Sequence, residues 1–265
     1  DGLKEEVINY KNAAGRTGGD ELLYSGMAMA IDILSSVCIN YAAEAKNNGR
    51  EQLAAALEHI AHHAPNTFLE AMQLSWLYSL ISGVLNYGRM DDYLGDFLVN
   101  DLKLGILDKQ EALAYIQSLW RLIAARNTVF HGRVIIGGKG RKNEAAADVF
   151  ALLAIEASRT VIEIEPQLSL RFYDGQNPLL MDKALDCIGE GRTYPILYND
   201  DVNIPSVQNA FEIGEEEAID YVMFGCGEYV INKKSIGSPN GIINLLKALE
   251  VTMFNGYDMF DRKER

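Results

Sequence analysis

Cysteine is scarce in this sequence: Cys38, Cys187 and Cys226 are the only three among 265 residues. Disulfide frameworks use an even number of cysteines at short spacings, so three widely separated ones exclude such a framework. A low cysteine content is typical of proteins of the reducing cytoplasm, which is where we expect this protein to act.

Positive charge is also in deficit. Lysine and arginine total 24 against 37 aspartates and glutamates, which gives a formal net charge of −13. This balance disfavours binding to nucleic acid or to anionic membranes, and no basic patch with interleaved aromatic residues offsets it. Neither nucleic acid nor a membrane is therefore an expected partner.

Long apolar runs are absent as well. Polar residues interrupt every apolar stretch well before the roughly 18 residues of a membrane span, so no transmembrane helix is predicted. The acidic start "DGLKEEVINYK" does not resemble a signal peptide. The chain also lacks G-x-S-x-G, Walker, H-E-x-x-H and paired C-x-x-C patterns, so it has none of these common catalytic or zinc-binding motifs.

What the sequence does contain is the composition of a soluble globular protein, 48% hydrophobic and 23% charged. Apolar residues at helical spacing predict helices over 20–48, 50–64, 67–85 and 108–127. We expect Asp20 and Asp108 to be N-caps, the second in a capping box with Glu111. The segment 67–85 is apolar on nearly all sides, which predicts a buried helix.

The second half of the chain alternates short apolar runs with helical segments. Strands are expected over 133–138, 166–174 and 194–200. Helices are expected over 143–158, 178–191 and 241–256, and the segment 215–225 passes from helix to strand. Repeated strand–helix units predict a parallel sheet or barrel covered by helices.

The stretch "MFGCGEYVIN" (223–232) holds the most reactive group, the Cys226 thiol, between Gly225 and Gly227. Glycines permit positive φ and close backbone approach, and residues two apart in an extended strand face the same side. The thiol and the Glu228 carboxylate would then enter one cavity at a strand end, where parallel α/β proteins place their sites. The alternative is a small buried cysteine in a turn beside a surface glutamate.

Two other features have less specific patterns. The loop "GGKGRKNE" (137–144) meets the dinucleotide pattern only in part, so a glycine turn capped by Asn143 is favoured over a nucleotide site. His59 and His63 are one helical turn apart and could share a metal, but no third ligand accompanies them. Histidines in a last helical turn also suit the helix dipole, and no metal site is predicted.

Together these segments resemble the large catalytic domain of glycyl radical enzymes, from about residue 20 to the end. The family's Tyr-x-x-x-Gly-Cys-x-Glu finger is similar to "DYVMFGCGEY" (220–229). Its other segments, in the family's order, are similar to "PNTFLEAMQLSWL" (65–77; Pro-x-x-Thr-Phe-x-Glu-Ala-x-Gln), "YGRMDDYL" (87–94; Gly-Arg-x-Asp-Gln), "VIIGGKGRKNEAAADVFALLAIEA" (134–157), "YPILYNDD" (194–201; Pro-x-x-Phe-Asn-Asp) and "INLLKALEVTMFNG" (243–256).

The resemblance implies a fold: a parallel ten-stranded α/β barrel in two five-stranded halves around the cysteine finger, here incomplete. The chain would be one catalytic-domain fragment over 1–265, helical over 1–130 and part of the barrel over 131–265.

The resemblance also implies a lyase mechanism of anaerobic metabolism. A glycyl radical takes hydrogen from the Cys226 thiol, and the thiyl radical abstracts hydrogen from an unactivated C–H of a small-molecule substrate. Glu228 acts as general acid/base while a C–O, C–N, C–S or C–C bond breaks. Pyruvate formate-lyase has two adjacent cysteines, and Gly225 in place of the first favours dehydratase-like chemistry over acyl transfer. The candidate substrate-binding residues are Tyr229, Asn240 and Tyr87.

The sequence departs from the family in two ways. Dehydratases usually show Gly-Cys-Val-Glu-Pro, and here Gly227 and Tyr229 replace the valine and the proline. The family's radical glycine lies in a C-terminal Arg-Val-x-Gly-Tyr-like loop that this chain lacks, so we expect the chain alone to be inactive.

The chain is expected to bind no cofactor directly. An activating enzyme with S-adenosylmethionine and an iron–sulfur cluster would install the radical in a full-length homodimer. The alternative is a non-catalytic truncated relative that serves as a binding or assembly module.

Overall fold

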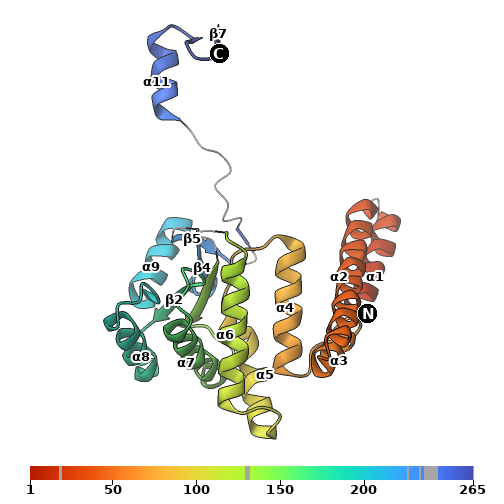
Figure 1. Cartoon of the computed structure of the whole chain (residues 1–265). Coiled ribbons are helices and arrows are strands. Elements are labelled where there is room, and N and C mark those ends of the chain that lie inside the picture. Colours follow the sequence, from red (N-terminus) through yellow and green to blue (C-terminus); the bar gives the residue numbers. More distant parts are fainter. Residues whose placement is uncertain (18–19, 129–131, 226, 233, 236–243, 265) are drawn as a thin grey trace.

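The structure is a computed structural model that describes residues 1–17, 20–128, 132–225, 227–232, 234–235 and 244–264. Its first half is helical, as predicted (Figure 1). The helices are α1 (Gly2–Thr17), α2 (Glu21–Asn47), α3 (Glu51–Ile60), α4 (Phe68–Ser82), α5 (Met90–Leu104) and α6 (Lys109–Ala125). Four of them match predicted segments, whereas α1 and α5 were not predicted as helices.

Side chains that were expected to cap helices do so. Asp20 accepts a hydrogen bond from the Leu23 N–H at 3.0 Å and begins α2. Asp108 accepts from the Glu111 N–H at 2.9 Å, and the Glu111 carboxylate accepts from the Asp108 N–H, which completes the capping box of α6. Each cap satisfies backbone donors that have no partner inside the helix.

The helix α4 is buried only in part. Phe68, Ala71, Met72 and Leu77 are buried, but Tyr78, Leu80 and Ile81 near its end are exposed. The expectation that this segment would be buried on all sides is therefore wrong for its last turn.

The second half contains the predicted strand–helix units. They are β1 (Arg133–Gly137), α7 (Glu144–Thr160), β2 (Gln167–Phe172), α8 (Pro178–Gly189), β3 (Ile196–Asn199), α10 (Glu215–Ala218) and β4 (Tyr221–Phe224). The helix α9 (Asp200–Phe211), between β3 and α10, was not predicted. The first three strands form one parallel sheet in the order β1-β2-β3, with Arg133 opposite Gln167 and Ser169 opposite Ile196. The predicted parallel sheet under helices is confirmed.

The remaining described elements are β5 (Glu228–Ile231), α11 (Leu245–Met253), β6 (Tyr257–Asp258) and β7 (Lys263–Glu264). β4 pairs with β5 and β6 pairs with β7, both antiparallel. The described residues thus contain a three-stranded parallel sheet, and a ten-stranded barrel is not shown. Three strands leave edges that only further strands could pair, so closure needs more strands than these.

The two faces of the parallel sheet contact different partners. Val134, Ile136, Leu168 and Leu170 point into a core that they share with α4 to α8. Ile135 points the other way and packs with Tyr221 and Met223 of β4. Because side chains alternate along a strand, Val134 and Ile136 face the helical core, whereas Ile135 between them faces the β4–β5 hairpin.

The helix α2 corrects the expectation about membrane spans. It has 27 residues and is long and apolar enough, by length and composition alone, to cross a membrane. The sequence reasoning required an unbroken apolar run, whereas scattered Ser, Gly and Asn residues lower hydropathy little when charges are few. A single helix of this kind is weak evidence for a membrane, and here Cys38, Ala42 and Ala45 pack against α3 and α4.

Gly95 of α5 lies close against the backbone of α7, and this contact generates a stability prediction. A Cβ at Gly95 would lie 2.9 Å from the backbone of Ala146 and Ala147, which cannot move as a side chain can. We expect Gly95→Ala to lower the free energy of unfolding by about 1–3 kcal/mol in urea titrations followed by circular dichroism.

Gly26→Ala is the matched control, because Gly26 also lies inside a helix but a Cβ there meets nothing within 4 Å. Alanine should raise the free energy of unfolding there by up to about 1 kcal/mol, since it is the better helix former. Equal effects at the two positions would contradict the close contact.

Candidate active site

The "GCGEY" segment lies at the tip of the β4–β5 hairpin. Phe224 pairs with Glu228 across the hairpin, and the Gly227 N–H donates to the Phe224 carbonyl at 2.9 Å. The return strand β5 was not predicted, because the tight turn between the two glycines was not recognised in the sequence. Cys226 and Asn240 lie outside the described residues.

Both glycines of the turn adopt backbone conformations that favour glycine. Gly225 has φ +51° and Gly227 has φ +123°. A Cβ at Gly225 would lie 2.9 Å from Oε2 of Glu228, and one at Gly227 would lie 3.1 Å from the Tyr198 hydroxyl. The turn therefore depends on glycine at both positions, for conformation and for space.

The other predicted site residues separate into two places. Glu228 begins β5, is exposed, and folds its carboxylate back toward Gly225. Tyr229 is half-buried, with its ring 5.1 Å from that of Tyr221 and 6.3 Å from that of Tyr198. Tyr87 instead lies in the helical core, where its hydroxyl accepts a hydrogen bond from Arg126 at 3.0 Å.

A buried ion pair ties the hairpin to the sheet. Arg171, on β2, donates from Nε and Nη2 to the two carboxylate oxygens of Asp200, both at 2.9 Å. Its Nη1 donates to the Tyr221 carbonyl at 2.9 Å, and the Tyr221 hydroxyl donates to Asp200 at 2.7 Å. The guanidinium lies 4.0 Å from the Tyr221 ring centroid, so β4 is held at both its backbone and its side chain.

The glycine loop after β1 is filled by carboxylates of the chain itself. The N–H groups of Gly137, Lys139 and Lys142 each donate at 2.7 Å, to Asp91, Asp200 and Asp92 respectively. Asn143 caps α7 by accepting from the Ala146 N–H, as the favoured interpretation expected. Backbone donors that already bind carboxylates do not form a phosphate cradle, which argues against nucleotide binding at this loop.

The Gly-Arg-x-Asp segment (88–91) contacts β1 and the same glycine loop. Gly88 accepts from the Ile135 N–H at 2.9 Å, so the segment runs beside β1. Arg89 donates to the carbonyls of Gly137 and Lys139, and burial, together with the charge of Arg171, lowers the pKa of Arg89 to about 10. Asp91 is fully buried and lies 3.3 Å from Arg141.

Arg133, the first residue of β1, reaches the hairpin from the sheet. It is 2% exposed, and its Nη2 donates to the Gly225 carbonyl at 2.8 Å. The side chains of Ser169, Gln167 and Tyr198 accept its other Nη hydrogen bonds. Asn86 holds the hairpin from a further direction, by donating to the Met223 carbonyl at 2.6 Å.

Arg133, Tyr198 and Asn86 were missed in the sequence. The alternation of side chains along each strand indicates which residues share a face of the sheet, such as Gln167 and Ser169 on β2. It carries no information about a contact between Arg133 and Gly225, which lies 92 residues away in the sequence. Asn86 contacts Met223, which lies 137 residues away along the chain, and no local pattern indicates a contact over that separation.

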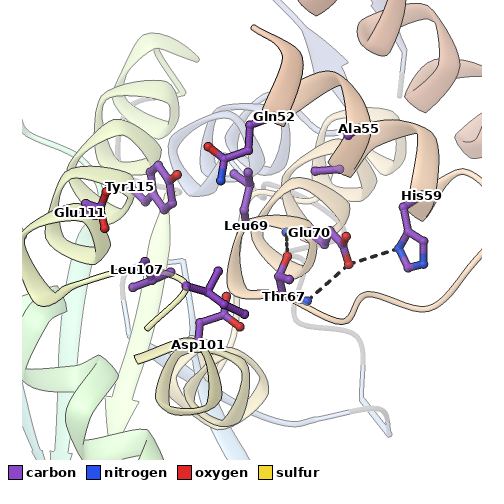
Figure 2. A pocket seen from close by; sticks show the side chains of 12 residues that line it. Gln52, Ala55, His59, Thr67, Leu69, Glu70, Asp101, Leu107, Glu111 and Tyr115 are labelled. Atoms are coloured by element: carbon purple, nitrogen blue, oxygen red, sulfur yellow. Dashed lines mark hydrogen bonds and ion pairs between the residues drawn. The ribbon is translucent and has the colours of Figure 1, made fainter. Parts of the chain in front are cut away.

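A cavity of about 340 Å³ lies elsewhere, between α3, α4, α5 and α6 (Figure 2). In it Glu70 contacts His59 at 3.2 Å and caps α4 with Thr67, and no residue of the hairpin or the parallel sheet lines it. The His59 ring stacks on that of His63 at 5.1 Å. Within the described part of the chain, no cluster of three or more His, Cys, Asp or Glu side chains could hold a metal ion.

The arrangement of sheet, helices and glycine hairpin is that of glycyl radical enzymes. A solved structure of a glycyl radical enzyme from Archaeoglobus fulgidus matches this fold with a TM-score of 0.77 at 20% identity, over 96% of this chain and 37% of that one. The match shows the fold, and this chain corresponds to about a third of that structure.

The chain belongs to the pyruvate formate lyase-like family, whose model matches residues 1–264. It is 26% identical to the "Probable dehydratase YbiW" of Escherichia coli over 97% of this chain and 37% of the relative. It is 27% identical to the (2S)-3-sulfopropanediol dehydratase of Klebsiella oxytoca over 78% of this chain and 27% of the relative. The predicted family is confirmed, and the chain spans about a third of the length of these glycyl radical relatives.

The Arg171–Asp200 pair generates a prediction. Asp200→Asn keeps the shape of the side chain but leaves a fully buried guanidinium without its charge partner. We expect the free energy of unfolding to fall by about 3–5 kcal/mol in urea titrations. Asp201→Asn is the control, since this neighbour is exposed and contacts Lys139 at the surface; a loss as large there would contradict the role of burial.

Asp91 generates a prediction about pH. Burial raises the pKa of Asp91 from 3.8 to about 6, against the opposing charges of Arg141 and Arg89. A carboxyl group with a higher pKa in the folded state binds a proton on folding, so its contribution to stability falls as pH rises from about 4 to about 6.

The test compares unfolding free energies of the wild-type chain and of Asp91→Asn across this pH range. The wild-type value minus the variant value should decrease with rising pH, by at most about 1.4 kcal/mol per pH unit. A difference that rises or stays flat between pH 4 and pH 6 would exclude the raised pKa.

Proposed function

We propose that this chain is the part of a glycyl radical lyase that carries the catalytic Cys226 and Glu228. The observation that carries this proposal is the hairpin tip, where Gly225, Gly227 and Glu228 of the family's Gly-Cys-x-Glu pattern lie and where Arg133 of the parallel sheet donates to the Gly225 carbonyl. Gly225 and Gly227 give this tip its shape, and the Glu228 carboxylate folds back over Gly225. A carboxylate beside the cysteine position is what proton transfer next to a radical centre requires.

The Cys226 thiyl radical takes a hydrogen atom from a substrate C–H, so an S–H bond forms and a carbon radical remains. A C–O, C–N, C–S or C–C bond next to that carbon breaks, while Glu228 exchanges a proton with the leaving group or with a neighbouring substrate hydroxyl. The thiol then returns its hydrogen atom to the product radical, which restores the thiyl radical.

The structure of the turn supports lyase chemistry over acyl transfer. Acyl transfer of the pyruvate formate-lyase type needs a second cysteine where this chain has Gly225. That position has φ +51°, and a Cβ there would lie 2.9 Å from Oε2 of Glu228. A cysteine at residue 225 would therefore be strained and would displace the proposed acid/base.

The remaining parts of the proposal concern the complete enzyme. A separate activating enzyme that uses S-adenosylmethionine and an iron–sulfur cluster would generate the glycyl radical, and this chain would hold neither group. The full-length protein would act as a cytoplasmic homodimer on a small hydroxylated substrate. Tyr229, packed between Tyr198 and Tyr221, is the described candidate nearest the hairpin tip for substrate contact.

The test uses the full-length gene product, expressed anaerobically with its activating enzyme. The wild type should show a two-line glycyl radical EPR signal and convert at least one of a panel of diols and hydroxylated acids or sulfonates. Cys226→Ala should keep the EPR signal but lose all conversion, because the stored radical is on a glycine and the thiol is needed only to pass it to the substrate. Glu228→Gln should keep the signal and lower kcat by about 100-fold or more.

Cys187→Ala is the matched control for the loss of a thiol, since Cys187 is buried in the helical core. It should keep both the EPR signal and the activity. A wild-type protein without the two-line signal, or a Cys226→Ala variant with unchanged turnover, would rule out the lyase and favour a binding or assembly module.

A further inference from the structure

Arg133 is a buried cation whose hydrogen-bond partners are all neutral. Its four Nη hydrogen bonds go to Ser169 Oγ at 2.7 Å, Gly225 O at 2.8 Å, Gln167 Oε1 at 3.1 Å and Tyr198 OH at 3.4 Å. Its Nε is buried without a hydrogen-bond partner, and no carboxylate in the described part of the chain forms an ion pair with it. Buried Arg171 and Arg141 each contact an aspartate, whereas Arg89, whose Nε is also without a hydrogen-bond partner, donates to carbonyls of the glycine loop and not to the hairpin.

A buried charge without a counter-charge destabilises a fold, so stability alone does not explain Arg133. Positions that break a local rule of this kind are expected at functional sites. What the guanidinium contributes is geometry: a charge-assisted hydrogen bond to the backbone carbonyl of Gly225, braced from β2 by Ser169 and Gln167.

Tyr198 holds the other side of the same turn. Its hydroxyl lies 3.1 Å from the position that a Cβ on Gly227 would take, and 3.4 Å from Nη1 of Arg133. The family pattern has phenylalanine and valine at these two positions. Here the Tyr198 hydroxyl, which phenylalanine lacks, lies so close to the Cβ position of residue 227 that little room is left for a side chain there.

We propose that Arg133 and Tyr198 are positioning residues that clamp Gly225 and Gly227, and thereby set the place of the thiol between them for hydrogen-atom transfer. The proposal rests on the proposed function, because it assumes that Cys226 exchanges hydrogen atoms with the glycyl radical. Misplacement of a reacting group by about 1 Å can slow a reaction by about 100-fold, so loosening either grip should slow the transfer.

The test needs no knowledge of the substrate. In D2O the Cys226 thiol carries deuterium, and reversible transfer breaks this S–D bond, forms a C–D bond at the radical glycine, and then breaks its C–H bond as S–H forms. The α-hydrogen of the glycyl radical is thereby replaced, and the two-line EPR signal collapses to one line. The rate of this collapse measures hydrogen-atom transfer between the two residues directly.

The collapse is followed in the activated full-length protein, for wild type, Arg133→Met, Tyr198→Phe and the control Arg159→Met. Arg159 is half-exposed on α7 and contacts Glu156 and Glu190, away from the hairpin. We expect Arg133→Met to slow the collapse about 100-fold and Tyr198→Phe to slow it less, with the number of spins per protein unchanged. Arg159→Met should collapse at the wild-type rate.

A purely structural role would lower the number of spins or the folded fraction and leave the rate of collapse per spin unchanged, and this result would overturn the proposal. If Arg133→Met does not fold, Tyr198→Phe decides, since it removes one oxygen from a half-buried ring; an unchanged collapse rate there would also overturn the proposal. A wild-type signal that keeps both lines in D2O would instead count against the radical transfer of the proposed function.

Discussion

The bidentate contact between Arg171 and Asp200 is the interaction on which the rest of the site depends. Asp200 also receives the Lys139 N–H and the Tyr221 hydroxyl, so one carboxylate joins β2, the glycine loop, α9 and β4. All these groups are removed from water, where an unpaired charge would be costly, so the contact specifies a single arrangement of four segments. The hairpin that carries the proposed catalytic residues is therefore fixed to the sheet at Tyr221, the first residue of β4.

The tip is held differently. Arg133 and Asn86 donate to backbone carbonyls of the hairpin, at Gly225 and Met223. These bonds constrain the path of the chain whatever side chains it carries, which suits a loop whose glycines leave the backbone free to move. Two arginines on the same face of the sheet thus have different roles. Arg171, paired with Asp200, stabilises the base of the hairpin, and Arg133, which has no counter-charge, positions its tip.

Much of this architecture could be predicted from particular residues. The caps at Asp20 and Asp108, the strand–helix alternation and the glycine turn before Asn143 follow from local chemistry, and the structure contains each of them. The family segments were also identified, but the contacts that they make with each other were not predicted. Gly88 to Asp91 and the glycine loop bind each other, although 46 residues separate Asp91 from Gly137. Helices α1, α5 and α9 and the return strand β5 were not predicted. In α9 the interior Pro205, a residue that ordinarily breaks a helix, argues locally against the helix that forms.

The sequence by itself determined the family, the order of the elements and the cysteine–glutamate pattern between glycines, because these depend on residues adjacent in the chain. Only the tertiary structure decided that Tyr87 belongs to the helical core, that Arg171 is buried against Asp200 and that Arg133 reaches Gly225. Such contacts join residues whose separation in sequence carries no periodic signal. They form when packing brings buried donors and acceptors together. A buried polar group without a hydrogen bond is costly, so each of them bonds to the groups that packing places beside it.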